Sequence, residues 1–523
     1  MFFKQLNKET IRQKLKFLPE AVLFLDILII LCLVGLACFS TIYPEGDVME
    51  HIKASYKVYN GEIPYRDFFE HHNPLLWYLT GWIVNLFIGN ITVIYWMDYI
   101  TYLFFLIGVY YAYKTIIEFL GHKIIGYISV LLILLPNCLM YYVYFKPDNY
   151  MLTCISAGVY YFFRYIRDIH RKDLVISYLF LWLAFMFIQK AVAFYPVFGG
   201  ATLWLLYKKH MPIKDFVCAI ILPVVLTFCF LFFWWSHGIL DLYWKCNFIF
   251  NSEMVKYMGD FAINIAWTVA YVVLGMAGLS ILIFYKSSNI YFRILSLIVI
   301  LNAAMKYFYF SPYVYYWYEA YYFAVPIAVL GGIRFVKNSK LLYYLCLLEL
   351  QIYFSVMGYY LYHDIAIVKP NFVTTNSYVE ENINRCDYNF VHPMGIYGKD
   401  MGYYWFLHGH VDVFGSKMGL HEIENVNEMI KKYRPKFVYV DDIYDRYEGY
   451  RENKILVHKF DMDLINKLYD KVMLFPEMGE WDSEKMQYVV QDSADGLYIL
   501  KSKYRKYNCK YNEKNRRWEY DKN

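Results

Sequence analysis

Acids and imidazoles are concentrated in two short stretches near the start of the chain, Tyr43–His51 and Asp67–Leu75. The surrounding sequence is apolar, and ionisable groups in such surroundings need water, a partner or a chemical role. A carboxylate here can take the proton of a hydroxyl group as that hydroxyl attacks an electrophilic carbon. We therefore expect the two stretches to form the floor of an active site, with the candidate residues Asp47, Glu50, Glu70, His71 and His72.

The second stretch also contains the ligand types of a metal site. A Glu with two adjacent His residues offers the nitrogen and oxygen ligands that divalent cations bind. Side chains of neighbouring residues diverge on a helix and alternate on a strand, so His71 and His72 would both reach one ion only across a turn. A divalent metal ion at Glu70, His71 and His72 and a pair of imidazoles solvated by lipid headgroups therefore both remain open.

The composition of the chain indicates that these residues lie in a membrane protein. Of 523 residues, 59% are hydrophobic and 21% aromatic, which is outside the usual range of a soluble domain. Apolar runs long enough to cross a membrane predict a mainly α, polytopic transmembrane helical bundle of about eleven spans. We place them near residues 21–42, 92–113, 124–145, 149–163, 174–189, 191–207, 216–236, 263–285, 291–310, 318–335 and 340–362.

The distribution of Lys and Arg predicts the orientation of this bundle. Basic residues gather in the N-terminal tail and in every second loop, at residues 4–16, 114–123, 164–172, 208–214, 286–293 and 334–340. Cytoplasmic loops carry this excess, which predicts an N-inside, C-outside chain in the cell membrane. The loop at residues 43–91 and the C-terminal region would then be extracytoplasmic. The net charge of +5 is mild for this length, so nothing indicates a nucleic-acid partner.

A change of composition at His363 divides the chain into a membrane part, residues 1–362, and a soluble domain, residues 363–523. In the second part, residues 425–433 have helical spacing, and residues 437–441 and 497–500 have the apolar character of strands. This pattern predicts a small extracytoplasmic α/β domain.

Within the loop 43–91, the spacing predicts a helix over 48–59 that ends at the turn signal Asn60-Gly61. The run from Leu75 to Ile88 follows Pro74 and is rich in Trp, Leu and Tyr. It is short for a twelfth span, and a crossing here would invert the charge pattern of every later loop. We therefore expect an amphipathic helix that lies in the membrane interface.

The same loop resembles the membrane glycosyltransferases of the C-type fold. An Asp follows the first span, and after a helix come Gly61-x-x-Pro64-Tyr65-x-Asp67-Phe68 and the helix start Pro74-Leu75-x-x-Tyr78. The pattern is similar to that of bacterial relatives of protein O-mannosyltransferases and of the lipid A aminoarabinose transferase. The resemblance extends to about Tyr322 and is strongest in the first hundred residues.

This resemblance implies that Asp47 is the catalytic carboxylate, although its position also fits the N-cap of the following helix. The relatives have a Glu-Lys-Pro-Pro-Leu stretch where this chain has Glu70-His71-His72-Asn73-Pro74-Leu75. Glu70 matches the Glu of the relatives. Either His71 or His72 would take the role of their Lys, and the sequence does not distinguish the two. Relatives often have a second acid directly after the catalytic Asp; here that position is valine, and Glu50 is the nearest substitute.

The resemblance also assigns substrate-binding roles to Lys146, Asp148 and Lys190. Asp148 matches an acid that faces the cavity of relatives, and a simple ion pair with Lys146 is the alternative. Lys190 matches a lysine directed at the lipid phosphate, where a cation suits the charge that grows on a leaving group. Snorkelling of Lys190 to the headgroups is its alternative.

The resemblance implies an enzyme that transfers a sugar, a hexose or a pentose, from a polyprenyl-phosphate carrier. The acceptor would be a glycan, lipid or protein of the cell envelope at the outer membrane face. A transporter or flippase of lipid-linked glycans is the first alternative, although such proteins commonly contain internal repeats, and we find none. A glycan polymerase or ligase is the second alternative, since it would share the outer site.

Overall fold

The structure is a computed structural model. The structure describes residues 20–38, 46–120, 123–134, 143–253, 275–281, 283–284, 287, 289–308, 314–335, 369–390, 395–405, 415–422, 424–440, 460–473, 481–482, 487–488, 496–505, 508–512 and 517–521.

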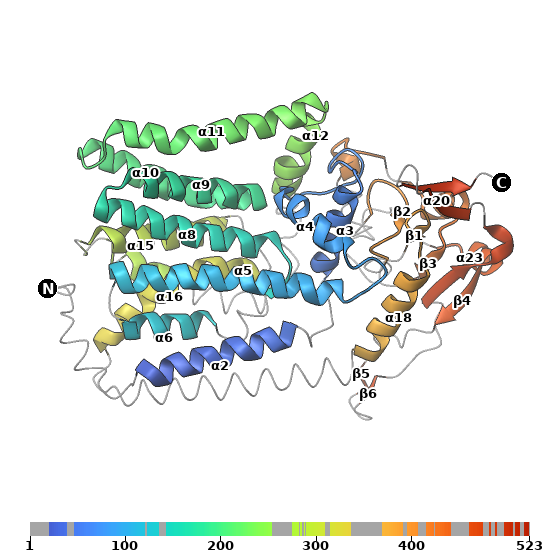
Figure 1. Ribbon diagram of the computed structural model, residues 1–523, viewed down its shortest axis with the longest axis horizontal. Coiled ribbons are helices and arrows are strands. Elements are labelled where there is room, and N and C mark those ends of the chain that lie inside the picture. The colour runs from blue at the N-terminus through green and yellow to red at the C-terminus, as the bar shows by residue number, and fades with distance from the viewer. Residues whose placement is uncertain are drawn as a thin grey trace.

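Long helices lie side by side in a bundle that forms one part of the molecule (Figure 1). They are α2 (Glu20–Cys38), α5 (Val93–Thr115), α6 (Lys123–Ile133), α8 (Pro147–Asp168), α9 (Arg171–Phe187), α10 (Tyr195–Tyr207), α11 (Ile213–Ser236), α15 (Ile290–Phe308) and α16 (Val314–Phe335). Short irregular turns extend some of them: η1 (Ile116–Leu120) continues α5, and η2 (Gln189–Phe194) precedes α10. The predominance of helix agrees with the prediction from composition.

The predicted number of about eleven membrane spans is wrong for the part of the chain that the structure describes. Two helices there are long and apolar enough to cross a membrane, Val93–Leu120 with 28 residues and Ile213–Ser236 with 24 residues. The predicted run 124–145 contains an 11-residue helix, α6, and the run 191–207 contains a 13-residue helix, α10. The run 340–362 and most of 263–285 lie outside the described residues.

The physical reason is that an apolar run does not distinguish a membrane span from a helix buried by its neighbours. Helix α8 illustrates this, because Met151, Ile155, Phe162 and most of its other side chains are buried within the protein. Helix α11 is the opposite case, since most of its apolar side chains are exposed, among them Val224 and Phe228.

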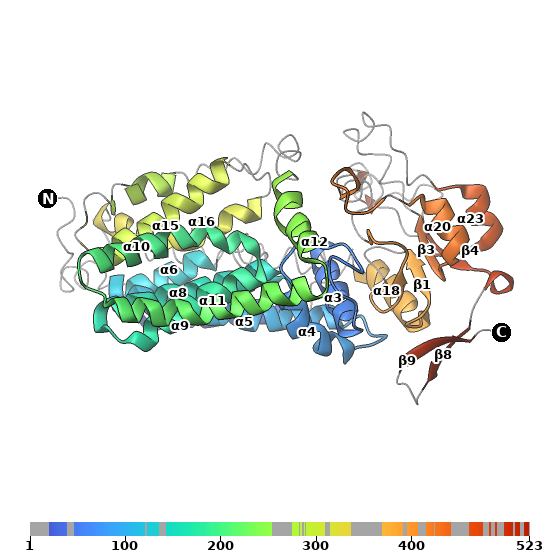
Figure 2. The ribbon, with the colours of Figure 1, turned by 90° about the horizontal axis from the view of Figure 1, so that it is seen from above.

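Helices α3 (Gly46–Tyr59) and α4 (Leu75–Asn85) lie at one end of the bundle, between it and the C-terminal domain (Figures 1 and 2). Helix α3 is the helix that the sequence predicts over 48–59. The two helices pack closely because Gly81 of α4 has no side chain; a Cβ atom there would lie 2.5 Å from the carbonyl oxygen of Ser55. The hydroxyls of Ser55 and Thr80 are 3.0 Å apart across the same contact.

The C-terminal domain contains a mixed five-stranded sheet of order β2-β1-β3-β7-β4. Its strands are β1 (Tyr388–Phe390), β2 (Lys399–Asp400), β3 (Phe437–Val440), β4 (Tyr469–Met473) and β7 (Gly496–Leu500). The central strand β3 pairs parallel to β1 and antiparallel to β7. Helices α18 (Lys369–Asn382), α20 (Val426–Tyr433) and α23 (Met462–Leu468) accompany the sheet. Two hairpins lie apart from it: β5 (Trp481–Asp482) with β6 (Gln487–Tyr488), and β8 (Asn508–Asn512) with β9 (Arg517–Asp521).

The predicted helix and strands of this domain are confirmed. Helix α20 begins where the sequence indicates, because the side chain of Asn425 accepts hydrogen bonds from the backbone N–H groups of Asn427 and Glu428. Strands β3 and β7 coincide with the predicted apolar runs.

One segment of the C-terminal domain, residues 395–405, packs into the core of the helical part. Ile396, Tyr397, Tyr403 and Trp405 are buried in the same hydrophobic cluster as Val48 of α3. The side chains around β3 and α20 form a separate cluster of their own. The candidate site therefore has the helical bundle on one side and a segment of the C-terminal domain on the other.

Candidate active site

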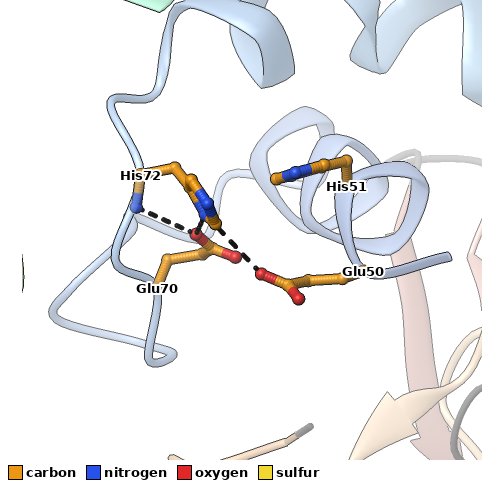
Figure 3. Close-up of side chains that lie close together, drawn as sticks. All are labelled: Glu50, His51, Glu70 and His72. Atoms are coloured by element: carbon orange, nitrogen blue, oxygen red, sulfur yellow. Dashed lines mark hydrogen bonds and ion pairs between the residues drawn. The ribbon is translucent and has the colours of Figure 1, made fainter. Parts of the chain in front are cut away.

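Four titratable side chains meet between α3 and the loop that follows it (Figure 3). Glu50 and His51 come from the second turn of α3, and Glu70 and His72 come from the loop. One ligand atom from each residue lies within 4.8 Å of the others. After α3 ends, the chain turns back toward this helix at Gly61. The φ of Gly61 is +89°, a conformation that glycine adopts without strain.

The carboxylate of Glu70 is the centre of this cluster. Its Oε2 accepts hydrogen bonds from the backbone N–H of His71 at 3.0 Å and of His72 at 3.3 Å. It also lies 3.1 Å from Nδ1 of His72, and that nitrogen is 3.7 Å from Oε1 of Glu50. The Glu70 side chain is fully buried, so its position is set by these contacts.

The environment gives the two carboxyl groups different protonation states. Burial and the nearby Glu70 carboxylate raise the pKa of Glu50 well above its ordinary value. Burial alone would also raise the pKa of Glu70, but hydrogen bonding from Glu50 and the charges of His72 and His71 hold it below its ordinary value. The two carboxyl groups are therefore placed to share one proton, which Glu50 retains more readily than Glu70.

His51 is neutral in this environment. Burial, with a smaller contribution from His72, lowers the pKa of His51 to about 3. The indole Nε1 of Trp77 lies 3.2 Å from Nδ1 of His51 and donates a hydrogen bond to it. Because an indole N–H can only donate, Nδ1 of His51 must accept, and the proton of the neutral ring is on Nε2.

The donor set fits a divalent cation that accepts nitrogen and oxygen ligands. Apart from the contact between the two carboxyl groups, Oε1 of Glu50 and Oε1 of Glu70 are buried without a hydrogen-bond partner among the described residues. Buried polar atoms of this kind require a partner. With His72, these oxygens would supply three ligands and leave a position open, as catalytic zinc sites do. His51 fits less well, because a histidine that binds a metal normally donates its second N–H to an acceptor.

Asp47 lies beside the four residues and forms an ion pair with Lys146. Its Oδ2 is 2.8 Å from the Lys146 Nζ, and the Asp47 side chain remains 40% exposed while Lys146 is buried. Burial acts to raise the pKa of Asp47, but the charge and the hydrogen bond of Lys146 lower it below its ordinary value. Asp47 is therefore a carboxylate at neutral pH and a weak base. It can accept a proton from a hydroxyl group only as that hydroxyl becomes more acidic.

A second polar cluster joins α8, η2 and α16. The Nζ of Lys190 contacts the carboxylates of Asp148 and Glu319. Lys146 and Asp148, which the sequence offers as a possible pair, are thus each paired elsewhere. Glu319 is a further member of this cluster, and it is not among the site residues predicted from the sequence.

The structure distinguishes between the two neighbouring histidines. His72 lies among the four residues, whereas the ring of His71 stacks on Phe250 with 5.5 Å between centroids. His51 and Trp77 are not among the site residues predicted from the sequence. His51 follows Glu50 directly, and that adjacency is the one signal that could have identified it.

The similarity of this chain to known proteins is limited. No protein-family model matches the chain, and no curated protein matches its sequence. Among solved structures, the chain is similar to an oligosaccharyltransferase of Archaeoglobus fulgidus, whose structure is a complex with zinc and sulfate. The two share 10% sequence identity with a TM-score of 0.42, over 85% of this chain and 71% of the other. At this level the similarity carries no inference about the present chain.

Proposed function

We propose that this protein is a membrane-associated glycosyltransferase that takes a sugar from a polyprenyl-phosphate carrier. The observation that supports this most is the juxtaposition of Asp47, ion-paired to Lys146, with the buried Glu50, Glu70 and His72. An ionised carboxylate thus lies next to three side chains that could bind a cation. Both are in the loop whose sequence resembles C-type glycosyltransferases.

The reaction would be a displacement at the anomeric carbon. The acceptor hydroxyl forms a bond to that carbon while the bond to the carrier phosphate breaks, and Asp47 accepts the hydroxyl proton. The leaving phosphate gains negative charge, which Lys146 offsets at close range. Glu50, Glu70 and His72 would hold a divalent cation, and that ion, when bound, would supply further positive charge near the phosphate.

The proposed setting is the outer face of the cell membrane. Helices Val93–Leu120 and Ile213–Ser236 provide the apolar surface for membrane association. Helix α4 exposes Leu79 and Trp82 on the face opposite its packed side, as an interfacial helix does. Cys386 of the C-terminal domain is disulfide-bonded, which favours an oxidising, extracytoplasmic compartment. The acceptor would be an envelope glycan, lipid or protein.

The test is a reconstitution in vesicles with a polyprenyl-phosphate sugar and an extract of envelope acceptors. We expect carrier-dependent transfer of the sugar, and loss of that transfer in Asp47→Asn. Movement of the same lipid across the bilayer is measured in parallel. A protein that moves the lipid but transfers no sugar would be a transporter, and the proposal would be wrong.

The location has its own test. Cysteines placed at Asn60 and at Asn425, in a background without the native Cys246, Cys386 and Cys509, should react with an impermeant thiol reagent in intact cells. Protection of both sites would place the loop in the cytoplasm, where transferases normally use nucleotide sugars.

A further inference from the structure

The segment 395–405 of the C-terminal domain contacts both elements that carry the candidate site. On the α3 side, Asp400 forms ion pairs with Lys53 and Lys57, one and two turns after Glu50. The side chains of Asp400, Lys53 and Lys57 are 6–7% exposed. Removing one member of a buried ion pair leaves an uncompensated charge, so these contacts fix α3 against the segment.

On the loop side, the same segment forms three hydrogen bonds with the backbone. The hydroxyl of Tyr403 donates to the carbonyl of Tyr65 at 2.7 Å, and the backbone N–H of Phe69 donates to the carbonyl of Tyr403 at 2.9 Å. The indole of Trp405 donates to the carbonyl of Phe69 at 2.9 Å. The last two bonds hold both backbone groups of Phe69, the residue directly before Glu70.

The helical part of the chain holds the other end of the same loop, through Gln189 of η2, Tyr243 of α12 (Leu240–Trp244) and Asn251, which follows η3 (Lys245–Phe250). Gln189 and Asn251 both donate to the carbonyl of His71, at 2.9 and 2.8 Å. The hydroxyl of Tyr243 donates to the side chain of Asn73 at 3.0 Å. Glu70 therefore lies between one set of contacts made by the C-terminal domain and another made by the helical part of the chain.

We propose that segment 395–405 is a positioning element that holds Glu70 and His72 against Glu50, with Tyr403 and Trp405 as its positioning residues. The segment contacts α3 and the loop at once, and it thereby holds the Glu50 and Glu70 side chains, which these two elements carry, at hydrogen-bonding distance. The part of the inference that concerns cation binding rests on the proposed function; the part that concerns the loop does not.

The experiment uses the full-length protein in detergent with Tyr403→Phe and Trp405→Phe, each of which removes one donor and keeps an aromatic ring. Tyr397→Phe is the matched control, because its hydroxyl, in the same segment, donates to Val84 of α4 at 3.1 Å and not to the loop. Backbone hydrogen exchange is measured in the peptide 65–72, and zinc affinity is measured by titration. Thermal unfolding confirms that each variant is folded. If one variant does not fold, the other is sufficient for the test.

We expect hydrogen exchange in peptide 65–72 to rise about fivefold in both variants, as the loss of one hydrogen bond predicts. Zinc affinity should fall about 10- to 100-fold, as it does when a residue that supports a ligand is removed. The control should change neither. Unchanged exchange and unchanged zinc affinity in folded Tyr403→Phe and Trp405→Phe would overturn the inference and leave the proposed function intact. Faster exchange in a protein that binds no zinc even as wild type would support the positioning role and count against the cation site.

Discussion

The indole of Trp77 donates a 3.2 Å hydrogen bond to Nδ1 of His51, and both side chains are buried. This contact assigns the tautomer of His51, because the neutral ring must then have its proton on Nε2. His51 consequently offers the site an N–H group and not a lone pair. The four clustered residues are thus unequal, with Glu50, Glu70 and His72 as the ligand candidates.

This relationship leads to a prediction for the two histidines. His51→Gln can still accept from Trp77 and present an N–H group, so zinc affinity should change little. His72→Gln removes a proposed ligand, and the loss should exceed the roughly 10- to 100-fold typical of a supporting residue. Zinc titration of both variants checks this. Equal losses in the two would show that His51 is a ligand as well.

Glu50→Gln tests whether Glu50 only shares a proton with Glu70 or also binds a cation. Glutamine has the shape of the protonated Glu50 that the raised pKa favours, so the free energy of unfolding at neutral pH should change by less than about 1 kcal/mol. Zinc affinity should nevertheless fall sharply, because the amide cannot supply a charged ligand. Glu62→Gln, which alters a partly exposed carboxylate paired to Lys57, is the control. Wild-type zinc affinity in Glu50→Gln would remove Glu50 from the ligand set.

Asp47→Asn should reduce sugar transfer by about two to four orders of magnitude, since the amide cannot accept the hydroxyl proton. Thermal stability should change little, because the Asp47 side chain is 40% exposed and the amide oxygen of asparagine can still accept a hydrogen bond from the buried Lys146. Asp241→Asn is the matched control, since it removes an ion pair of the same 2.8 Å length with Lys245 on the surface. Transfer at the wild-type rate by Asp47→Asn would show that another group is the base.

Glu380 of α18 should make the stability of the protein depend on pH. Burial raises the pKa of this carboxyl to about 7 from the ordinary 4.5, although Lys53 and the backbone N–H of Ile396, which donates at 2.6 Å, act in the opposite direction. Below about pH 4.5 the group is protonated in both the folded and the unfolded chain and has no effect. As the pH rises to 7, the unfolded chain loses the proton first, and stability falls by up to about 3 kcal/mol.

Glu380→Gln should therefore be more stable than the wild type above pH 7 and equal to it near pH 4.5. Thermal unfolding across this pH range measures the difference. If the difference in melting temperature between the two proteins is the same at every pH, Glu380 ionises freely in the folded state.

The sequence alone determined the local elements and the place of the candidate site. Helix α3 ends at Tyr59, just before the Asn60-Gly61 turn signal, and α20 begins after Asn425, because turns and caps depend on residues adjacent in the chain. The density of acids and imidazoles at residues 47–51 and 70–72 identified the loop for the same local reason. The helical character of the chain also followed from composition.

Only the tertiary structure decided which of these residues meet. Apolar runs predicted too many membrane spans, because burial by neighbouring helices and burial by lipid select the same side chains. The selection of His72 over His71 depends on a turn that no spacing rule gives. The pairing of Lys146 with Asp47, the hydrogen bond from Trp77 to His51 and the contacts of Tyr403 and Trp405 with the loop join residues distant in the chain. Such contacts follow from how the elements pack, and the order of residues along the chain does not contain that information.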